Sequence, residues 1–213
     1  MACMEKEAVF RWSVFNAHRR AIRQSYPSVY NIRIRKKLLD VIMEELKGNE
    51  SILDVGASTR SMGEKVGKRF PSVTYRTMDI DTSSTHDYHS LDVIMERFDM
   101  VVLSEVVELL VFREGIGLIK KIKGLLPAGG KLVVSTPNVH HPNRFFDPDH
   151  KTPYRYDDMA GALLWAGFDV EKIYRIYNDG FIKRLIRLYV MAPVHRYFDV
   201  DFAKSVVVVA LKR

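Results

Sequence analysis

The sequence alternates between short apolar runs and amphipathic stretches of helical length, and this alternation constrains the fold more than any other feature. Apolar runs that predict strands occur at 52–55, 73–78, 98–103, 131–135, 170–177 and 205–211. Patterns that predict helices lie between them at 62–70, 116–126 and 156–165. Strands separated by helices favour a parallel α/β sheet with helices on both faces. The last strand follows an irregular stretch, so we expect it to be inserted antiparallel.

The chain of 213 residues is long enough for one domain with a complete core. Residues 1–48 are predicted to form an N-terminal helical extension, because apolar residues recur there at helical spacing among lysines and arginines. Residues 49–213 are predicted to form a Rossmann-like core. Since no repeat or linker interrupts the sequence, we expect a single domain.

The composition limits the classes of binding partner and the cellular location that we expect. The formal net charge is +7, and the excess gathers at 19–37 and 183–213. Such a charge favours nucleic acid, phosphorylated small molecules or acidic lipid surfaces, or it simply solvates the surface. The N-terminus lacks the apolar stretch of a signal peptide, and the longest apolar run, 206–211, is too short to span a bilayer. We therefore expect a cytoplasmic protein.

Metal binding is not expected. Cys3 is the single cysteine, which excludes an intrachain disulfide and a cysteine-based zinc site. The histidines at 140, 141 and 150 fit no zinc spacing.

The stretch SILDVGASTRSMGEKVGKRF predicts a buried strand, a tight turn and a helix. Ligands of open α/β sheets bind beyond the carboxyl ends of the strands, which is where this turn lies. Gly56 allows the turn, and Ala57 and Ser58 are small enough for a ligand to approach the backbone. The patterns G-x-G-x-x-G and G-x-x-x-x-G-K-[ST] are both absent. Ser58 suits such a loop if its backbone angle is ordinary, and Arg60 could point to solvent.

Other polar residues end strands at the same predicted edge. Asp79 ends the strand in YRTMDID, where a carboxylate can accept hydrogen bonds from both hydroxyls of a ribose. Asp87 lies in HDYHSL, and Ser104 and Glu105 end the strand in FDMVVLSEVVELL. Purely structural roles compete with these readings. Asp79 could cap a turn, Asp87 could be solvated, and Glu105 with Glu108 could begin a helix.

In this order and spacing, the segments between 51 and 177 resemble the class I S-adenosylmethionine-dependent methyltransferases. The branch that methylates sugars, quinones and other small metabolites is most similar, through the strand ending STPN, a histidine-bearing loop and the helix ending AGF. The resemblance implies a Rossmann-like methyltransferase fold with a mostly parallel seven-stranded sheet, an antiparallel last strand and added N-terminal helices. It also implies S-adenosylmethionine as cofactor and S-adenosylhomocysteine as product.

The resemblance implies roles for individual residues. The implied cofactor contacts are Asp54, Gly56, Ala57 and Ser58 at the methionine end, Asp79 at the ribose with Ile80 beside it, Asp87 and Tyr88 at the adenine, and Ser104 and Glu105 beside the transferred methyl group. His150 matches the loop histidine of the family and is the predicted base or substrate contact. Arg144, Tyr154 and Arg155 are predicted to bind the acceptor, and the arginines suit a phosphate or carboxylate. His140 and His141 are expected to be solvated loop residues.

The segment DGFIKRLIRLYVMAP predicts an amphipathic helix over 180–191. Its apolar residues share one face, and Lys183, Arg184 and Arg187 lie towards the other. Such a helix could lie on a membrane surface. We expect instead that it packs on the protein's own core or on a partner subunit, which is the usual role of an amphipathic helix. The oligomeric state stays open.

The predicted function is methyl transfer from S-adenosylmethionine to oxygen or nitrogen of a small acceptor, anionic or sugar-like. The protein would supply orientation and a dry site, and a histidine would serve as base for a hydroxyl acceptor. An RNA methyltransferase is one alternative because of the cluster RIRKK, although no RNA-binding module or stacking platform is evident. The other is a non-catalytic cofactor-binding or scaffold protein. The departures at Ser58, Arg60 and Leu109 from residues common in the family support it.

Overall fold

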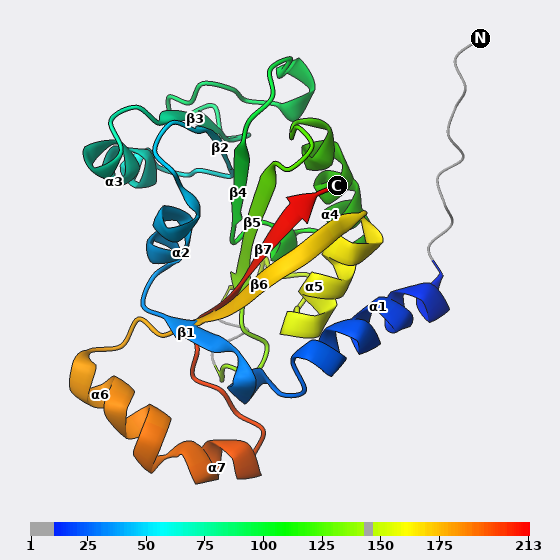
Figure 1. Ribbon diagram of the computed structural model, residues 1–213, viewed down its shortest axis with the longest axis vertical. Helices are drawn as coiled ribbons and strands as arrows, with labels where there is room; N and C mark the ends of the chain where they lie inside the picture. Colours follow the sequence, from blue (N-terminus) through cyan, green and yellow to red (C-terminus); the bar gives the residue numbers. More distant parts are fainter. Residues whose placement is uncertain (1–10, 143–146) are drawn as a thin grey trace.

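The computed structural model describes residues 11–142 and 147–213, which form a seven-stranded sheet with helices on both faces (Figure 1). The strands are β1 (Arg33–Arg35), β2 (Ser51–Val55), β3 (Thr74–Met78), β4 (Met100–Ser104), β5 (Lys131–Pro137), β6 (Phe168–Ile176) and β7 (Ser205–Lys212). The α-helices are α1 (Trp12–Ser25), α2 (Leu38–Glu45), α3 (Ser61–Arg69), α4 (Phe112–Gly124), α5 (Tyr156–Trp165), α6 (Phe181–Leu185) and α7 (Ala192–Tyr197). A π-helical turn (Ile186–Val190) joins α6 to α7, and 3₁₀ turns span Val29–Asn31, Leu91–Val93 and Val107–Leu109.

The strand order is β1-β6-β7-β5-β4-β2-β3. β7 runs antiparallel to both of its neighbours, β5 and β6, and every other neighbouring pair is parallel. The predicted α/β sheet and its antiparallel last strand are therefore confirmed. Because β2, β3, β4, β5 and β6 are mutually parallel, their carboxyl ends lie at one edge of the sheet, together with the start of β7.

β1 is the one strand of the sheet that was not predicted, and it corrects the prediction that residues 1–48 form a helical extension. β1 lies inside that segment and pairs with β6, with Ile34 opposite Arg175. The local sequence carries a strand signal, since Ile32 and Ile34 alternate with polar residues at a period of two. The apolar residues at helical spacing that end at Leu46 form a helix only from Leu38 onward, where α2 begins. The N-terminal segment thus contributes a strand to the sheet as well as two helices.

Two apolar layers sandwich the sheet. Because successive side chains of a strand point to opposite faces, Val101 packs into one layer and Val102 into the other. The first layer contains Phe15 of α1 together with residues of α4 and α5, and the second contains Val41 of α2 and Val66 of α3. Figure 1 shows the same division, with α1, α4 and α5 on one side of the sheet and α2 and α3 on the other.

Residues 181–198, here called the α6–α7 arm, lie apart from these layers. The arm leaves the end of β6, and Figure 1 shows it projecting below the sheet. Phe181 is 67% exposed and Tyr189 is 73% exposed. The expected packing of 180–191 on the protein's own core is therefore wrong. No helix within 11–142 and 147–213 is both long enough and apolar enough to cross a bilayer.

Candidate active site

The loop after β2 leaves its backbone open to close approach by a ligand. Gly56 has φ +74°, and a Cβ there would overlap the side chain of Val106. The N–H groups of Gly56 and Ala57 both donate to the carbonyl of Met78, which binds the loop to the end of β3. These contacts make a tight turn in which only glycine fits at position 56. α3 begins at Ser61, directly after the loop.

Ser58 was expected to suit the loop if its backbone angle was ordinary. Its φ is +47°, so the backbone angle is not ordinary. Few residues other than glycine adopt this left-handed region. A hydrogen bond fixes the conformation, since the Ser58 N–H donates to Oδ2 of Asp79 at 2.8 Å. The loop keeps the shape that a glycine would give it, at some cost in backbone strain.

Asp54 lies beneath this loop and is buried. Its Oδ2 accepts a hydrogen bond from the hydroxyl of Tyr75 at 2.8 Å. Burial raises the pKa of the Asp54 carboxyl to about 6, against the lowering effect of the Tyr75 bond and nearby His86. Asp54 is thus a support of the loop, and the surface that a ligand would meet consists of residues 56–58.

Asp79 stands at the end of β3 and organises its surroundings through both carboxylate oxygens. Oδ2 accepts the Ser58 N–H, and Oδ1 accepts the Asp81 N–H at 3.0 Å. A carboxylate has about four acceptor positions, so each oxygen keeps one for another donor. Ile80 follows Asp79 and is 81% exposed. It lines an open groove of about 760 Å³, together with Met78 and Leu91. The groove also has polar and charged side chains in its lining, among them His89 and Lys121. A carboxylate with free acceptor positions next to such a groove suits a ribose followed by a base.

Arg60 and Asp87 form an ion pair that was not anticipated. The Arg60 guanidinium donates to the carbonyl of Thr85 at 2.9 Å and lies 3.2 Å from Oδ2 of Asp87, so it does not simply point to solvent. The Asp87 carboxylate also accepts the N–H and the hydroxyl of Thr77, each at 2.9 Å, and pairs with Arg76. These donors hold its pKa below the usual range against the opposing effect of burial.

The partners of Asp87 give it a structural role. Its carboxylate anchors the segment that returns to β3. The implied contact with adenine stays a prediction. Tyr88 is bridged to Met78 in this return, and its hydroxyl donates to Glu96. The backbone of 87–88 therefore lies along β3, next to the groove beside Ile80.

β4 ends at a polar pair that faces the next strand. The hydroxyls of Ser104 and Ser135 are 3.2 Å apart, and the Ser135 hydroxyl donates to Glu105 at 3.0 Å. Glu105 has φ +53°, so it and Ser58 are two of the three non-glycine residues with positive φ in the described chain. Backbone strain of this kind concentrates at functional sites. The Glu105 side chain is exposed where it opens onto a cavity, and desolvation by the surrounding protein raises its pKa.

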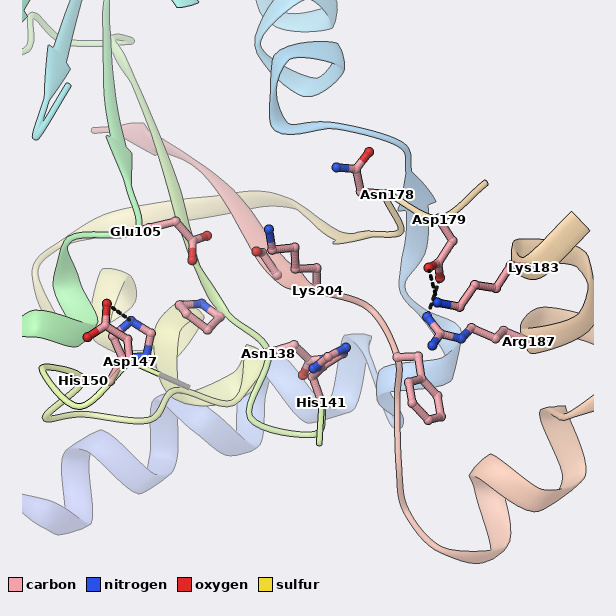
Figure 2. A pocket seen from close by; sticks show the side chains of 13 residues that line it. Glu105, Asn138, His141, Asp147, His150, Asn178, Asp179, Lys183, Arg187 and Lys204 are labelled. Carbon is pink, nitrogen blue, oxygen red and sulfur yellow. Dashed lines mark hydrogen bonds and ion pairs between the residues drawn. The ribbon is translucent and has the colours of Figure 1, made fainter. Parts of the chain in front are cut away.

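The cavity next to Glu105, here called the central cavity, has a volume of about 550 Å³. Its walls come from the carboxyl ends of β4, β5 and β6, the start of β7, the loop before α5 and the α6–α7 arm. Figure 2 shows Glu105, His150 and Lys204 around it, with Lys183 and Arg187 on the side of the arm. The cavity therefore lies at the sheet edge where the predicted ligand site was placed.

Cationic and anionic groups alternate around the central cavity. Lys204 forms no ion pair among the described residues, and its charge lowers the pKa of Glu105 against the larger effect of desolvation. Asp179 pairs with Arg187 at 2.6 Å and with Lys183 at 3.5 Å (Figure 2). This mixture suits a polar molecule with hydroxyl groups and at least one negative charge.

The loop that carries the histidines follows β5 and reaches the cavity. Nε2 of His150 lies 4.0 Å from Oδ2 of Asp147, and the His150 side chain is 19% exposed. His141 also lines the cavity, against the expectation that it is only solvated. Burial lowers the pKa of His141, with Arg187 acting in the same direction. His140 lies outside the lining, and its Nδ1 contacts the carbonyl of Asp199.

A second, much smaller cavity lies behind His150. It is lined by Glu108, Thr136 and Tyr154 as well as His150. Glu108 is 2% exposed, and neither of its carboxyl oxygens has a hydrogen-bond partner among the described residues, although the Thr136 hydroxyl is close by. Burial, reinforced by the charge of Glu105, raises the pKa of Glu108 to about 8. The carboxyl is therefore largely protonated at neutral pH.

The predicted acceptor contacts do not gather at the central cavity. Tyr154 is 1% exposed, packs against Phe112 and belongs to the core. Arg155 pairs with Asp157 at 3.1 Å at the start of α5. Arg144 lies outside the described residues. No group of three or more histidine, cysteine or acidic side chains positioned for a metal ion occurs in the described part of the chain.

Sequence reasoning missed several residues of the central cavity. They are Asn138, His141, Asn178, Asp179, Lys183, Arg187, Phe202 and Lys204. Asn138 carried a signal, because it ends the strand in STPN. Lys183 and Arg187 were read only as the polar face of a helix. Phe202 and Lys204 stand in an irregular stretch before β7, where no periodicity points to a site.

The comparisons with known proteins concern the fold. A methyltransferase dependent on S-adenosylmethionine from Archaeoglobus fulgidus superposes with a TM-score of 0.61 at 17% identity, covering 93% of this chain and 94% of that one. Another, from Aquifex aeolicus, gives 0.60 at 12% identity, covering 84% and 90%. The [4+2]-cyclase SpnF gives 0.59 at 16% identity, covering 82% and 80%. No family model matches the sequence, and neither does any curated protein.

The chain thus has the Rossmann-like fold of the class I methyltransferases, as the resemblance implied. Since a [4+2]-cyclase shares this fold, the reaction has to be argued from the site.

Proposed function

We propose that the protein transfers a methyl group from S-adenosylmethionine to a hydroxyl of a small polar acceptor. The observation that carries the proposal is the position of Asp79. Its carboxylate ends β3, holds the loop after β2 and keeps an acceptor position on each oxygen beside the exposed Ile80. This arrangement fits a nucleoside with two vicinal hydroxyls.

The residues present fit the cofactor in three places. Asp79 would hold the ribose, and the groove beside Ile80 and Leu91 would take the adenine. The backbone of 56–58, with no Cβ at Gly56, would border the methionine end. When bound, the cofactor supplies an activated methyl group on a sulfonium. Glu105 lies between this cradle and the central cavity, because it ends β4, next to β2 in the sheet.

The acceptor would occupy the central cavity. Lys204 would pair with a negative charge of the acceptor, and Asn138 and Asn178 could bond to its hydroxyls. His150 would take the proton of the reacting hydroxyl, since imidazole suits proton transfer near neutral pH. Glu105 would hold that hydroxyl in line. Both side chains face the same volume in Figure 2.

Titration calorimetry of the purified protein with S-adenosylmethionine and with S-adenosylhomocysteine tests the cofactor. We expect micromolar binding of at least one of them. Folded protein that binds neither would contradict the proposal and favour a scaffold that has this fold without the cofactor. A screen of hydroxylated anionic metabolites for S-adenosylhomocysteine formation then tests the acceptor. Turnover only with RNA, together with salt-sensitive RNA binding, would favour the RNA methyltransferase instead.

A further inference from the structure

The α6–α7 arm exposes most of its apolar side chains, and Lys183 and Arg196 are exposed with them, whereas Arg187 turns inward to Asp179. Of the seventeen large apolar side chains that are exposed in the described chain, ten lie in 181–198. They are Phe181, Ile182, Leu185, Ile186, Tyr189, Val190, Met191, Val194, Tyr197 and Phe198. An ordinary surface helix buries its apolar face and exposes its polar one. This arm exposes ten large apolar side chains in eighteen residues, here called its apolar stripe, far more than scattered single residues would explain.

Polar contacts on the inner side hold the arm in place. Arg187 pairs with Asp179 at 2.6 Å, and its guanidinium lies 4.3 Å from the centre of the Phe202 ring. The Tyr30 hydroxyl donates to the carbonyls of His195 at 2.8 Å and Val200 at 3.1 Å. The arm is therefore anchored to the body of the protein. Ile182, Ile186 and Met191 line an open groove beside Phe202, and the other apolar side chains of the arm are exposed.

The charge of the arm indicates what covers the stripe. Residues 181–198 include Lys183, Arg184, Arg187 and Arg196 and no acidic residue. A second copy of the chain would bring the same cations together, which opposes self-association through this surface. A bilayer with anionic headgroups matches both properties, because cations bind the headgroups while apolar and aromatic side chains enter the interface. Tyr189 and Tyr197 have the amphipathic rings that favour this depth.

We propose that the α6–α7 arm docks the protein on the surface of an anionic bilayer through this apolar stripe. The arm would lie in the plane of the interface, with Phe181, Tyr189 and Phe198 inserted. Lys183 and Arg187 line the central cavity as well, so docking would place the mouth of that cavity near the headgroups. The inference does not depend on the proposed function, because the binding of lipid requires no turnover.

Co-sedimentation of the full chain with vesicles tests the proposal. One set of vesicles contains phosphatidylcholine alone, and the other contains equal parts of phosphatidylcholine and phosphatidylserine. We expect binding to the anionic set that weakens as salt is added. The double variant Phe181→Ser/Tyr189→Ser should reduce the affinity by at least about tenfold, since two exposed apolar anchors are lost. Arg184→Glu should reduce it by about fivefold or more.

Matched controls separate the arm from general stickiness. Val93→Ser/Met95→Ser removes two apolar side chains that are 62% and 92% exposed elsewhere, and Arg113→Glu makes the same charge change on α4. Both controls should bind anionic vesicles as the native protein does. Native protein that stays in the supernatant at low salt would overturn the proposal, and so would arm variants that bind unchanged. A native dimer that the double variant converts to monomer would show a subunit interface instead.

Discussion

Asp79 and Ser58 are joined by a hydrogen bond of 2.8 Å between the Oδ2 atom of one and the backbone N–H of the other. The bond links the carboxyl end of β3 to the loop after β2, on two neighbouring strands. It fixes the left-handed backbone of Ser58, and Asp79 lies between Met78 and Ile80, which both line the groove. A loop that departs from the usual glycines therefore keeps a defined shape.

Asp79→Asn should weaken the binding of S-adenosylhomocysteine by about ten- to a hundredfold, because a charge-assisted hydrogen bond to a ribose hydroxyl is lost. Calorimetric titration measures the change. Asp81→Asn is the matched control, since Asp81 is a nearby exposed carboxylate whose hydrogen bonds come from Ser83, with the Ser83 N–H at 2.8 Å. Equal affinities of the native protein and Asp79→Asn would remove Asp79 from the cofactor site.

Ser58→Gly should stabilise the protein by about 0.5 kcal/mol, because glycine adopts φ near +47° without the steric cost that serine incurs there. The greater entropy of glycine in the unfolded chain offsets part of the gain. Urea denaturation of both proteins measures the difference. Ala57→Gly is the control, since Ala57 lacks a positive φ and should lose about 0.5–1 kcal/mol. If Ser58→Gly loses as much as Ala57→Gly, then residue 58 is not strained.

Periodicity in the sequence predicted the sheet well because its strands are buried on both faces and read as apolar runs. α5 was predicted with its observed bounds, Tyr156–Trp165. The strand β1 was missed because only three residues form it, and the alternation of Ile32 and Ile34 with arginines is short beside the helical pattern that follows. A short edge strand depends on its pairing with β6, which local sequence does not show.

The site was predictable where chemistry follows a strand end and not elsewhere. Asp79, Glu105 and His150 each follow a strand or lie in the loop after one. Asp79 is bonded to the loop after β2, and Glu105 and His150 line the central cavity at the same edge of the sheet. Tyr154 and Arg155 are equally polar by type, yet one packs in the core and the other pairs with Asp157. Lys204 was missed because its position depends on how β7 is inserted between β5 and β6. Side-chain direction in loops follows from tertiary contacts that no periodicity encodes.

Glu108→Gln should make the protein more stable at alkaline pH than the native protein. The folded pKa of Glu108 is raised from 4.5 to about 8, so the unfolded chain gives up this proton more readily than the folded one. Native stability should therefore fall as pH rises from 4.5 to about 8, and this contribution is absent from the variant. The advantage of the variant at the upper end should be on the order of a few kcal/mol.

Urea denaturation of both proteins across this pH range measures the effect of Glu108. Comparing the variant with the native protein at each pH is essential, because Asp54 and Glu105 also have raised pKa values and change stability in the same direction. Glu114→Gln, on α4, is the control and should follow the native curve. A difference between Glu108→Gln and native protein that stays constant with pH would show that the Glu108 carboxyl is not protonated in the fold.

His150→Gln should lower kcat by at least about a hundredfold with the acceptor that the screen identifies, since a general base typically contributes that much. The affinity for S-adenosylhomocysteine should change little, because His150 lines the central cavity and lies outside the groove beside Ile80. His140→Gln is the matched control, as its ring contacts the Asp199 carbonyl outside the cavity. If His150→Gln turns over at the native rate while Glu105→Gln does not, the carboxylate at the end of β4 is the base, and His150 only closes the cavity.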